Sequence, residues 1–191
     1  FIDIHSHSPT PLGQKYQALD GVTTALELEA GAFPVLLYGA MINGQSRLNF
    51  GASTGYGNMR GEVMQGIRQA HIFDPPQTLG LLGWWTELKS KFGHVRTANT
   101  EIADADERTE LEALIHEGID QGGMGIGLPL DYYSEGVDND ELRAVFKVAA
   151  ERHLPIFVHI RRGINGDPSG LYEVLALVRE TGASMHICHI T

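Results

Sequence analysis

The stretch FIDIHSH (residues 1–7) predicts a β-strand that carries two histidines on one face. Side chains alternate along a strand, so Asp3, His5 and His7 share one side and the two isoleucines share the other. Imidazole is the commonest protein ligand for metal ions, and His-X-His at strand spacing lets two rings converge on one ion. The stretch therefore favours a metal site inside a barrel. The ordinary alternative is a half-exposed strand whose histidines form hydrogen bonds.

Composition argues against several classes of function. A chain of 191 residues can bury one sizeable core. Its net charge of -10 makes nucleic acid and anionic membrane surfaces poor partners. Cys188 is the single cysteine, which excludes an intrachain disulfide and fits a reducing compartment, so we expect a cytoplasmic protein. No apolar stretch approaches the ~18 residues of a membrane span.

Strands and helices alternate along the chain, which is the pattern of an α/β barrel with parallel strands. We expect residues 1–191 to form a single partial catalytic domain, the first six β/α units of a TIM-type barrel, because a complete barrel takes roughly 250 residues. The isolated chain is not expected to form a closed, active barrel. Residues 32–100 are the least regular and predict an irregular insertion, with a glycine-rich turn at 51–61. The expected strands are residues 1–7, 21–29, 47–53, 123–130, 156–161 and 184–191.

The alternation of side chains places further metal-ligand types on one face of the later strands. His159 lies opposite the apolar residues of its strand, His189 lies opposite Cys188, and Glu27 and Glu29 lie opposite two leucines. These positions fall at or near the C-terminal strand ends, where barrel enzymes hold their chemistry. Glu29 could bridge two ions or orient a water, and Glu27, one layer deeper, ranks second. The predicted site, with the ligand chemistry of a zinc-type hydrolase, is His5, His7, Glu29, His159 and His189.

Other candidate ligands are set aside. Cys188 and His186 point away from His189 in a regular strand, so we expect neither to bind the metal. The remaining histidines fall in expected loops or helices, where surface or core positions are the default. They are His71, His94, His116 and His153.

The quoted residues resemble the amidohydrolase superfamily, which has His-X-His after strand one, histidines after strands five and six, and an aspartate after strand eight. More narrowly, the chain is similar to the D-aminoacylase (N-acyl-D-amino-acid deacylase) branch at residues 1–7, 21–24, 158–161 and 187–189. The resemblance implies one or two zinc ions bound by the four site histidines. It also implies a small-molecule substrate, an N-acyl-D-amino acid whose linear amide C–N bond is hydrolysed. The general base would be an aspartate beyond Thr191.

The chain departs from the pattern of this branch at two positions. A cysteine ligand usually follows strand two, where a gap-free match places Ala30 and a one-residue shift places Glu29, which the strand parity favours. A lysine usually follows the strand-six histidine by two residues, and here that position is Thr191. In the family, that lysine is the expected partner of the substrate carboxylate. Arg161 or Arg162 is therefore expected to bind the carboxylate here, since a guanidinium matches a carboxylate with two hydrogen bonds. An arginine paired with a nearby acid is the alternative.

Three functions compete at this point. The first is the metal-dependent amidohydrolase. The second is a phosphoesterase or nuclease similar to the TatD type, through residues 130–133 and 154–159, although strand four lacks the ligand glutamate of that type. The third is a non-catalytic barrel relative that binds a metal. The absence of a lysine at the end of strand four argues against a lysine-carbamate bridge between two metals, and the sequence carries no signal for the oligomeric state.

Overall fold

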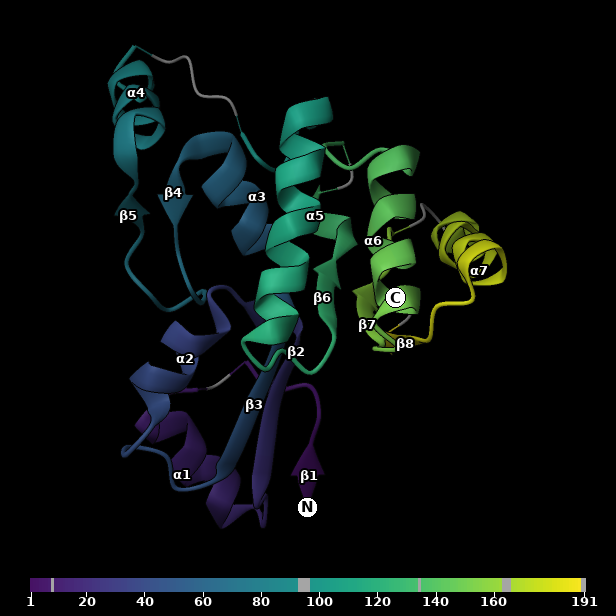
Figure 1. Ribbon diagram of the computed structural model, residues 1–191. Coiled ribbons are helices and arrows are strands. Elements are labelled where there is room, and N and C mark those ends of the chain that lie inside the picture. The colour runs from purple at the N-terminus through teal and green to yellow at the C-terminus, as the bar shows by residue number, and fades with distance from the viewer. Residues whose placement is uncertain (8, 93–96, 134, 163–165, 190–191) are drawn as a thin grey trace.

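Six parallel strands form one sheet in the order β1-β2-β3-β6-β7-β8, and helices cover its outer face (Figure 1). The structure is a computed structural model that describes residues 1–7, 9–92, 97–133, 135–162 and 166–189. The predicted α/β fold with six parallel strands is confirmed. The elements are β1 (Ile2–Asp3), α1 (Pro11–Leu19), β2 (Thr24–Ala32), α2 (Val35–Ile42), β3 (Asn49–Gly55), α3 (Tyr56–Gln65), the antiparallel pair β4 (Ile67–Arg68) and β5 (Gln77–Thr78), α4 (Gly80–Ser90), α5 (Ala105–Asp120), β6 (Ile126–Pro129), the 3-10 helix η1 (Leu130–Tyr133), α6 (Asn139–Glu151), β7 (Ile156–His159), α7 (Ser169–Thr181) and β8 (Met185–His189).

The sheet is curved into a half-barrel. Strand β2 contacts β6 and β7 as well as its hydrogen-bonded neighbour β3, which a flat sheet in this order would not allow. Gly127 of β6 permits the close approach, because a Cβ there would lie 2.7 Å from the Glu29 carbonyl oxygen of β2. The curvature brings the C-terminal ends of distant strands toward one another on the concave side.

The outer face of the sheet carries the main hydrophobic core. Helices α5, α6 and α7 lie side by side over β6, β7 and β8 (Figure 1). Ile126, Leu128, Ile156 and Val158 are fully buried against these helices, while alternate residues face the concave side. The apolar face predicted for the strand at residues 156–161 is therefore confirmed. Among the described residues, no helix is both long enough and apolar enough to cross a membrane.

The first strand is much shorter than the predicted 1–7 and ends at Asp3. The Asp3 carboxylate accepts a hydrogen bond from the His5 backbone N–H at 3.1 Å, and the Ser6 N–H donates to the Leu26 carbonyl at 3.0 Å. A local side-chain acceptor of this kind competes with the strand ladder and turns the chain. His5 and His7 consequently lie in the segment after β1 rather than within a strand.

Strand β2 is longer than predicted, because Gly31 does not end it. Gly31 has a φ of +67° inside the strand, where the pairing register with β3 shifts. A Cβ at this position would lie 2.6 Å from the Ser53 Oγ and 2.8 Å from the Gly55 backbone. Glycine is thus required for an irregularity that continues the strand.

The region 32–100 is more regular than the sequence predicts. It holds α2, β3, α3, the β4–β5 pair and α4. The expected glycine-rich turn at 51–61 is the end of β3 followed by α3, so that prediction is wrong. Its glycines permit close packing instead, because a Cβ at Gly57 would collide with the Tyr133 hydroxyl.

A buried ion pair joins α3 to α6. Arg60 of α3 is fully buried and pairs with Glu141 of α6, which also accepts a hydrogen bond from the Tyr56 hydroxyl at 2.6 Å. The remaining Arg60 N–H groups donate to backbone carbonyls, so the guanidinium is well satisfied in the absence of water. These carbonyls belong to Ala98, Glu101 and Gly136.

Replacing Arg60 by Met should lower the free energy of unfolding by about 3–5 kcal/mol, because Glu141 would become a buried charge without a partner. Urea denaturation followed by circular dichroism measures this. Arg143→Met is the matched control, since Arg143 pairs with Asp140 and Glu180 near the surface. Such pairs contribute at most about 1 kcal/mol. Equal losses in the two variants would contradict the role assigned to Arg60.

Candidate metal centre

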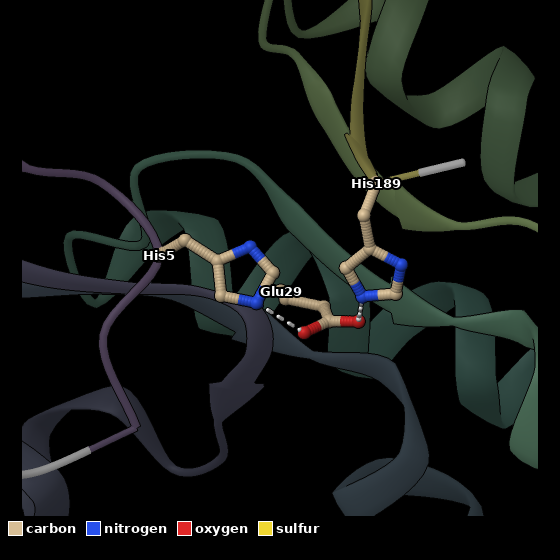
Figure 2. A group of neighbouring side chains, drawn as sticks. All are labelled: His5, Glu29 and His189. Carbon is tan, nitrogen blue, oxygen red and sulfur yellow. Dashed lines mark ion pairs between the residues drawn. The ribbon is translucent and has the colours of Figure 1, made fainter. Parts of the chain in front are cut away.

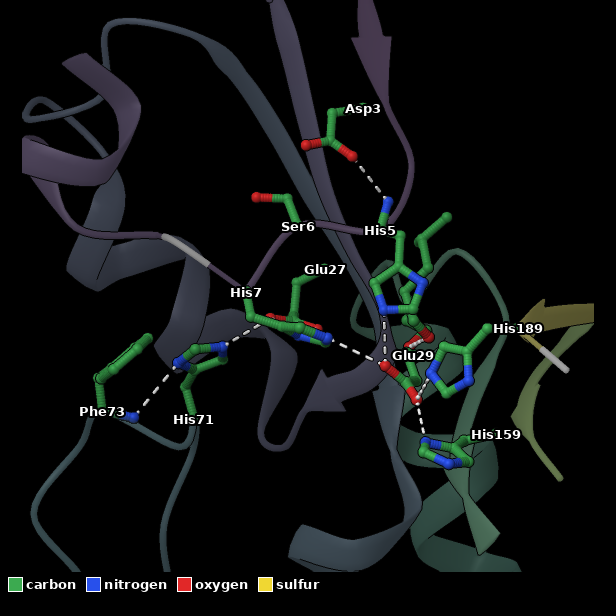
Figure 3. A network of polar contacts seen from close by, with 12 residues as sticks. Asp3, His5, Ser6, His7, Glu27, Glu29, His71, Phe73, His159 and His189 are labelled. Carbon is green, nitrogen blue, oxygen red and sulfur yellow. Dashed lines mark hydrogen bonds and ion pairs between the residues drawn. The ribbon is translucent and has the colours of Figure 1, made fainter. Parts of the chain in front are cut away.

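The carboxylate of Glu29 on β2 lies at the centre of four imidazole rings (Figure 3). Its Oε2 is 2.8 Å from His5 Nε2 and 3.0 Å from His7 Nε2. Its Oε1 is 2.7 Å from His159 Nδ1 and 3.3 Å from His189 Nε2. The rings come from the segment after β1 and from the last residues of β7 and β8. The structure therefore brings all five predicted site residues into one cluster.

The cluster offers a suitable donor set for a metal ion. Ligand atoms of His5, Glu29 and His189 all lie within 4.8 Å of one another (Figure 2). In addition, the Nε2 atom of His159 and the Nδ1 atom of His189 are buried and have no hydrogen-bond partner among the described residues. Unpartnered buried nitrogens are rare and point to a ligand or water at the site. Imidazole and carboxylate together suit zinc, so these residues fit such an ion.

Electrostatic interactions within the cluster keep its carboxylates ionised. Burial raises the pKa of Glu29, but the hydrogen bond from His7 and the interactions with His5 and His159 outweigh it and lower the pKa to about 2. Hydrogen bonds to Glu27 and then Glu29 raise the pKa of His7 to about 10, against the effect of its partial burial. Without a metal, His7 is therefore a cation between two carboxylates at neutral pH.

Glu27, two residues before Glu29 on β2, lies behind His7. It is 1% exposed, and its oxygens are 2.9 and 3.0 Å from His7 Nδ1. The Oε2 atom is also 3.0 Å from the Nε2 atom of His71. Burial raises the pKa of Glu27, but the hydrogen bonds from His7 and His71 outweigh it, so the pKa lies below its usual value. None of these bonds joins Glu27 to the other three site histidines. Glu27 therefore lies on the opposite side of the His7 ring from Glu29.

Sequence reasoning missed the contact of His71 with the site. His71 lies in the core, as the default for a loop histidine predicts, and it is fully buried. Its position follows the short strand β4, and nothing in the sequence indicates that this loop lies over Glu27. His94, another of the histidines set aside, lies outside the described residues.

Asp131 is a second residue that sequence reasoning did not assign to the site. It follows β6 within η1, and its Oδ2 is 3.9 Å from His159 Nε2. Its Oδ1 accepts the backbone N–H of Arg162 at 2.7 Å, and its Oδ2 pairs with the guanidinium at 3.2 Å. The available signal was its place directly after a barrel strand, where the predicted ligands also lie.

The two candidate arginines differ in their surroundings. Arg161 pairs with Glu173 of α7 at 3.0 Å and donates to the Val137 carbonyl at 2.6 Å. The side chain of Arg162 is 59% exposed and pairs with Asp131 beside the cluster. Arg162 is therefore more accessible to a bound molecule than Arg161.

Strand β8 contains a bulge that changes its predicted parity. Val158 pairs with Ile187, but His159 pairs with His189, so Cys188 is an additional residue. The His186 ring lies 5.9 Å from the ring of Phe157, which shares the concave face with His159. The prediction that His186 points away from this face is therefore wrong. Burial, and then the charges of Glu29 and Glu27, raise the pKa of the Cys188 thiol to about 12.

The structure also distinguishes between the two residues considered for the ligand position after strand two. Glu29 lies in the cluster, whereas Ala30 lines a cavity of about 270 Å³ together with Asn58 and Tyr133. The one-residue shift favoured by strand parity agrees with this arrangement. Thr191, the position of the expected lysine, lies outside the described residues.

Comparison with known proteins shows similarity in fold. No protein-family model and no curated protein matches the chain. An N-acyl-D-glutamate deacylase from Bordetella bronchiseptica, solved with zinc and a phosphonate mimic of the tetrahedral intermediate, matches with a TM-score of 0.71 and 21% identity over 100% of this chain and 40% of that one. A D-aminoacylase with a binuclear metal centre matches with a TM-score of 0.63 and 17% identity, over 100% and 40% of the two chains. Another D-aminoacylase structure, described as defining a novel subset of amidohydrolases, matches with a TM-score of 0.60 and 17% identity, over 97% and 39%.

At these identities the likeness concerns the fold. The chain spans about 40% of the length of the solved structures that it matches. The predicted resemblance to the D-aminoacylase branch is confirmed at the level of the fold, and the half-barrel corresponds in fold to about 40% of these solved chains.

The free energy of unfolding of the metal-free protein should depend on pH through His7 and Glu29. The contribution of His7 is fully present below its ordinary pKa of 6.5 and is lost as pH rises toward about 10. The contribution of Glu29 is present above its ordinary pKa of 4.5 and is lost as pH falls toward about 2. The test is to measure the midpoint of urea denaturation about once per pH unit between pH 3 and pH 10, with a chelator present to keep the protein free of metal. His7→Gln should flatten the alkaline limb, and an unchanged alkaline slope in that variant would contradict the assignment.

Proposed function

We propose that the protein is a zinc-dependent amidohydrolase that cleaves the amide C–N bond of an N-acyl-D-amino acid. The observation that carries the proposal is a buried carboxylate, that of Glu29, which is surrounded by four imidazoles on the concave face of the half-barrel. The fold likeness to a zinc-bound N-acyl-D-glutamate deacylase and to D-aminoacylases supports the same chemistry.

The donor set supports one or two zinc ions. His5, Glu29 and His189 form the tightest group of ligand atoms, and His7 and His159 complete the set around the same carboxylate. A bound zinc ion supplies a Lewis acid for the scissile carbonyl and a water that is activated near neutral pH. Glu29 is ionised, and its two oxygens face different histidines, so it is the residue that would contact both ions if two were bound.

The chain's own residues would orient the substrate. Arg162 lies at the rim with an exposed guanidinium, which can form two hydrogen bonds with the carboxylate of an amino acid. Asp131 holds both the backbone and the side chain of Arg162 in place. Asp131 is therefore engaged by Arg162 and is not proposed as the general base.

Zinc analysis and hydrolysis assays of the full-length protein with paired N-acyl-D- and N-acyl-L-amino acids test the proposal. We expect stereoselective amide cleavage by the zinc-loaded protein. His5→Ala and His189→Ala should lose more than roughly 100-fold in kcat/KM and bind zinc weakly, since loss of a partner behind a ligand already costs about 10–100-fold. His116→Ala, on the outer side where its ring contacts Arg152, is the control and should behave as wild type.

Two other outcomes would contradict this function. Hydrolysis of phosphodiesters without amide cleavage would favour the nuclease-like alternative. Bound zinc without hydrolysis of any ester, amide or phosphodiester would favour the non-catalytic metal-binding relative.

The role of Arg162 has its own test. Arg162→Ala should raise KM for an N-acyl-D-amino acid by roughly 10–100-fold, because hydrogen bonds to charged groups contribute about 1.5–3 kcal/mol. The same variant should hydrolyse a substrate whose carboxylate is replaced by a carboxamide as well as wild type does. Arg161→Ala is the matched control, since Arg161 is held by Glu173 and Val137. A larger KM effect at Arg161 than at Arg162 would reverse the assignment.

A further inference from the structure

We propose that Glu27 and His71 are positioning residues that hold the ring of His7 with its Nε2 atom directed at the metal centre. This inference rests on the proposed metal site and adds a chain of hydrogen bonds behind it. The chain of hydrogen bonds runs from the backbone of Phe73 through His71 and Glu27 to His7, across three segments that are far apart in sequence (Figure 3).

The first link fixes the tautomer of His71. The backbone N–H of Phe73 can only donate, and it lies 3.4 Å from His71 Nδ1, which must therefore accept. The proton of the neutral ring is then on Nε2, 3.0 Å from the Oε2 atom of Glu27. An ionised carboxylate only accepts, so the direction of this hydrogen bond is from His71 to Glu27.

The second link fixes the orientation of His7. Both oxygens of Glu27 lie within 3.0 Å of His7 Nδ1, so this nitrogen carries a proton and donates it to Glu27. The other ring nitrogen, Nε2, is left pointing at Glu29, 3.0 Å away. A carboxylate that accepts the second N–H of a ligand histidine sets its tautomer and its orientation, and it raises its basicity as a ligand.

The burial of Glu27 and His71 indicates that their arrangement is rigid. Glu27 is 1% exposed and His71 is fully buried. The His71 ring is in contact with the rings of Tyr38 of α2 and Phe73, at centroid distances of 5.4 and 5.5 Å. Groups of this kind are expensive to bury unless they are hydrogen-bonded, so the pair is stable only in this geometry.

Glu27 and His71 are not placed as ligands of a second ion. Within the described part of the chain, the only group of three ligand atoms close enough to share an ion is that of His5, Glu29 and His189. Both nitrogens of His71 already have partners, Phe73 and Glu27. Their arrangement suits orientation of a ligand rather than ligation.

Zinc affinity of the full-length protein, measured by competition with a chromogenic chelator, tests the inference. Glu27→Gln should weaken zinc binding by roughly 10–100-fold, and His71→Phe, which keeps a ring but loses the donor, by about 10-fold. His71→Gln restores a donor at the position of Nε2 and should recover most of the loss. His116→Phe is the matched control and should bind zinc as wild type does.

The outcomes separate this inference from the proposed function. If wild type binds no zinc, the proposed metal site fails and the positioning role fails with it. If wild type binds zinc and Glu27→Gln and His71→Phe bind it equally tightly, only the positioning role is overturned. Should a variant not fold, ¹⁵N NMR of the histidine rings in zinc-loaded wild type decides. A proton on His7 Nδ1 and on His71 Nε2 supports the inference, and the opposite tautomers overturn it.

Discussion

Burial of the Glu29 carboxylate is the constraint on which the concave side of the molecule depends. Removing a carboxylate from water costs several kcal/mol unless partners compensate for the lost hydration. Here the partners are imidazoles from residues 5, 7, 159 and 189. Two of these residues follow β1 at one edge of the sheet, and the other two end β7 and β8 at its other side. Their interactions with Glu29 on β2 are therefore satisfied only when the sheet is curved. The half-barrel and the site therefore depend on the same interactions.

On the outer face of the sheet, the direction of each side chain depends on local backbone geometry. Ile156 and Val158 point to the helices because side chains alternate along a strand, whatever the rest of the chain does. This is why the apolar face of β7 and the position of His159 on the opposite, concave face could be predicted from sequence. The convergence of His5, His7 and His189 with His159 could be predicted because all four lie at or near the C-terminal ends of strands, where barrel enzymes hold their chemistry.

The features that the sequence did not predict depend on contacts that the alternation of side chains along a strand does not determine. The turn after Asp3 arises because its carboxylate accepts the His5 N–H, which replaces a ladder bond. The extra residue at Cys188 moves the end of β8 by one position, so parity fails there. His71 reaches Glu27 across 44 residues of sequence, through a loop whose path no local pattern specifies. Sequence patterns could therefore place the residues of the candidate metal centre near one another, but not His71, which contacts Glu27 from another loop.

The two acids of β2 raise a further electrostatic problem that His7 resolves. Glu27 and Glu29 are both buried and face the same side of one strand, so their charges repel each other in a region that water screens weakly. His7 lies between them, with Nδ1 at Glu27 and Nε2 at Glu29, and its hydrogen bonds to the two carboxylates raise its pKa to about 10. A cation bound at Glu29 would take over the charge that the Nε2 proton of His7 supplies, while His7 would keep its Nδ1 proton toward Glu27. The arrangement thus requires one positive charge between the two acids, and a proton or a metal ion can supply it.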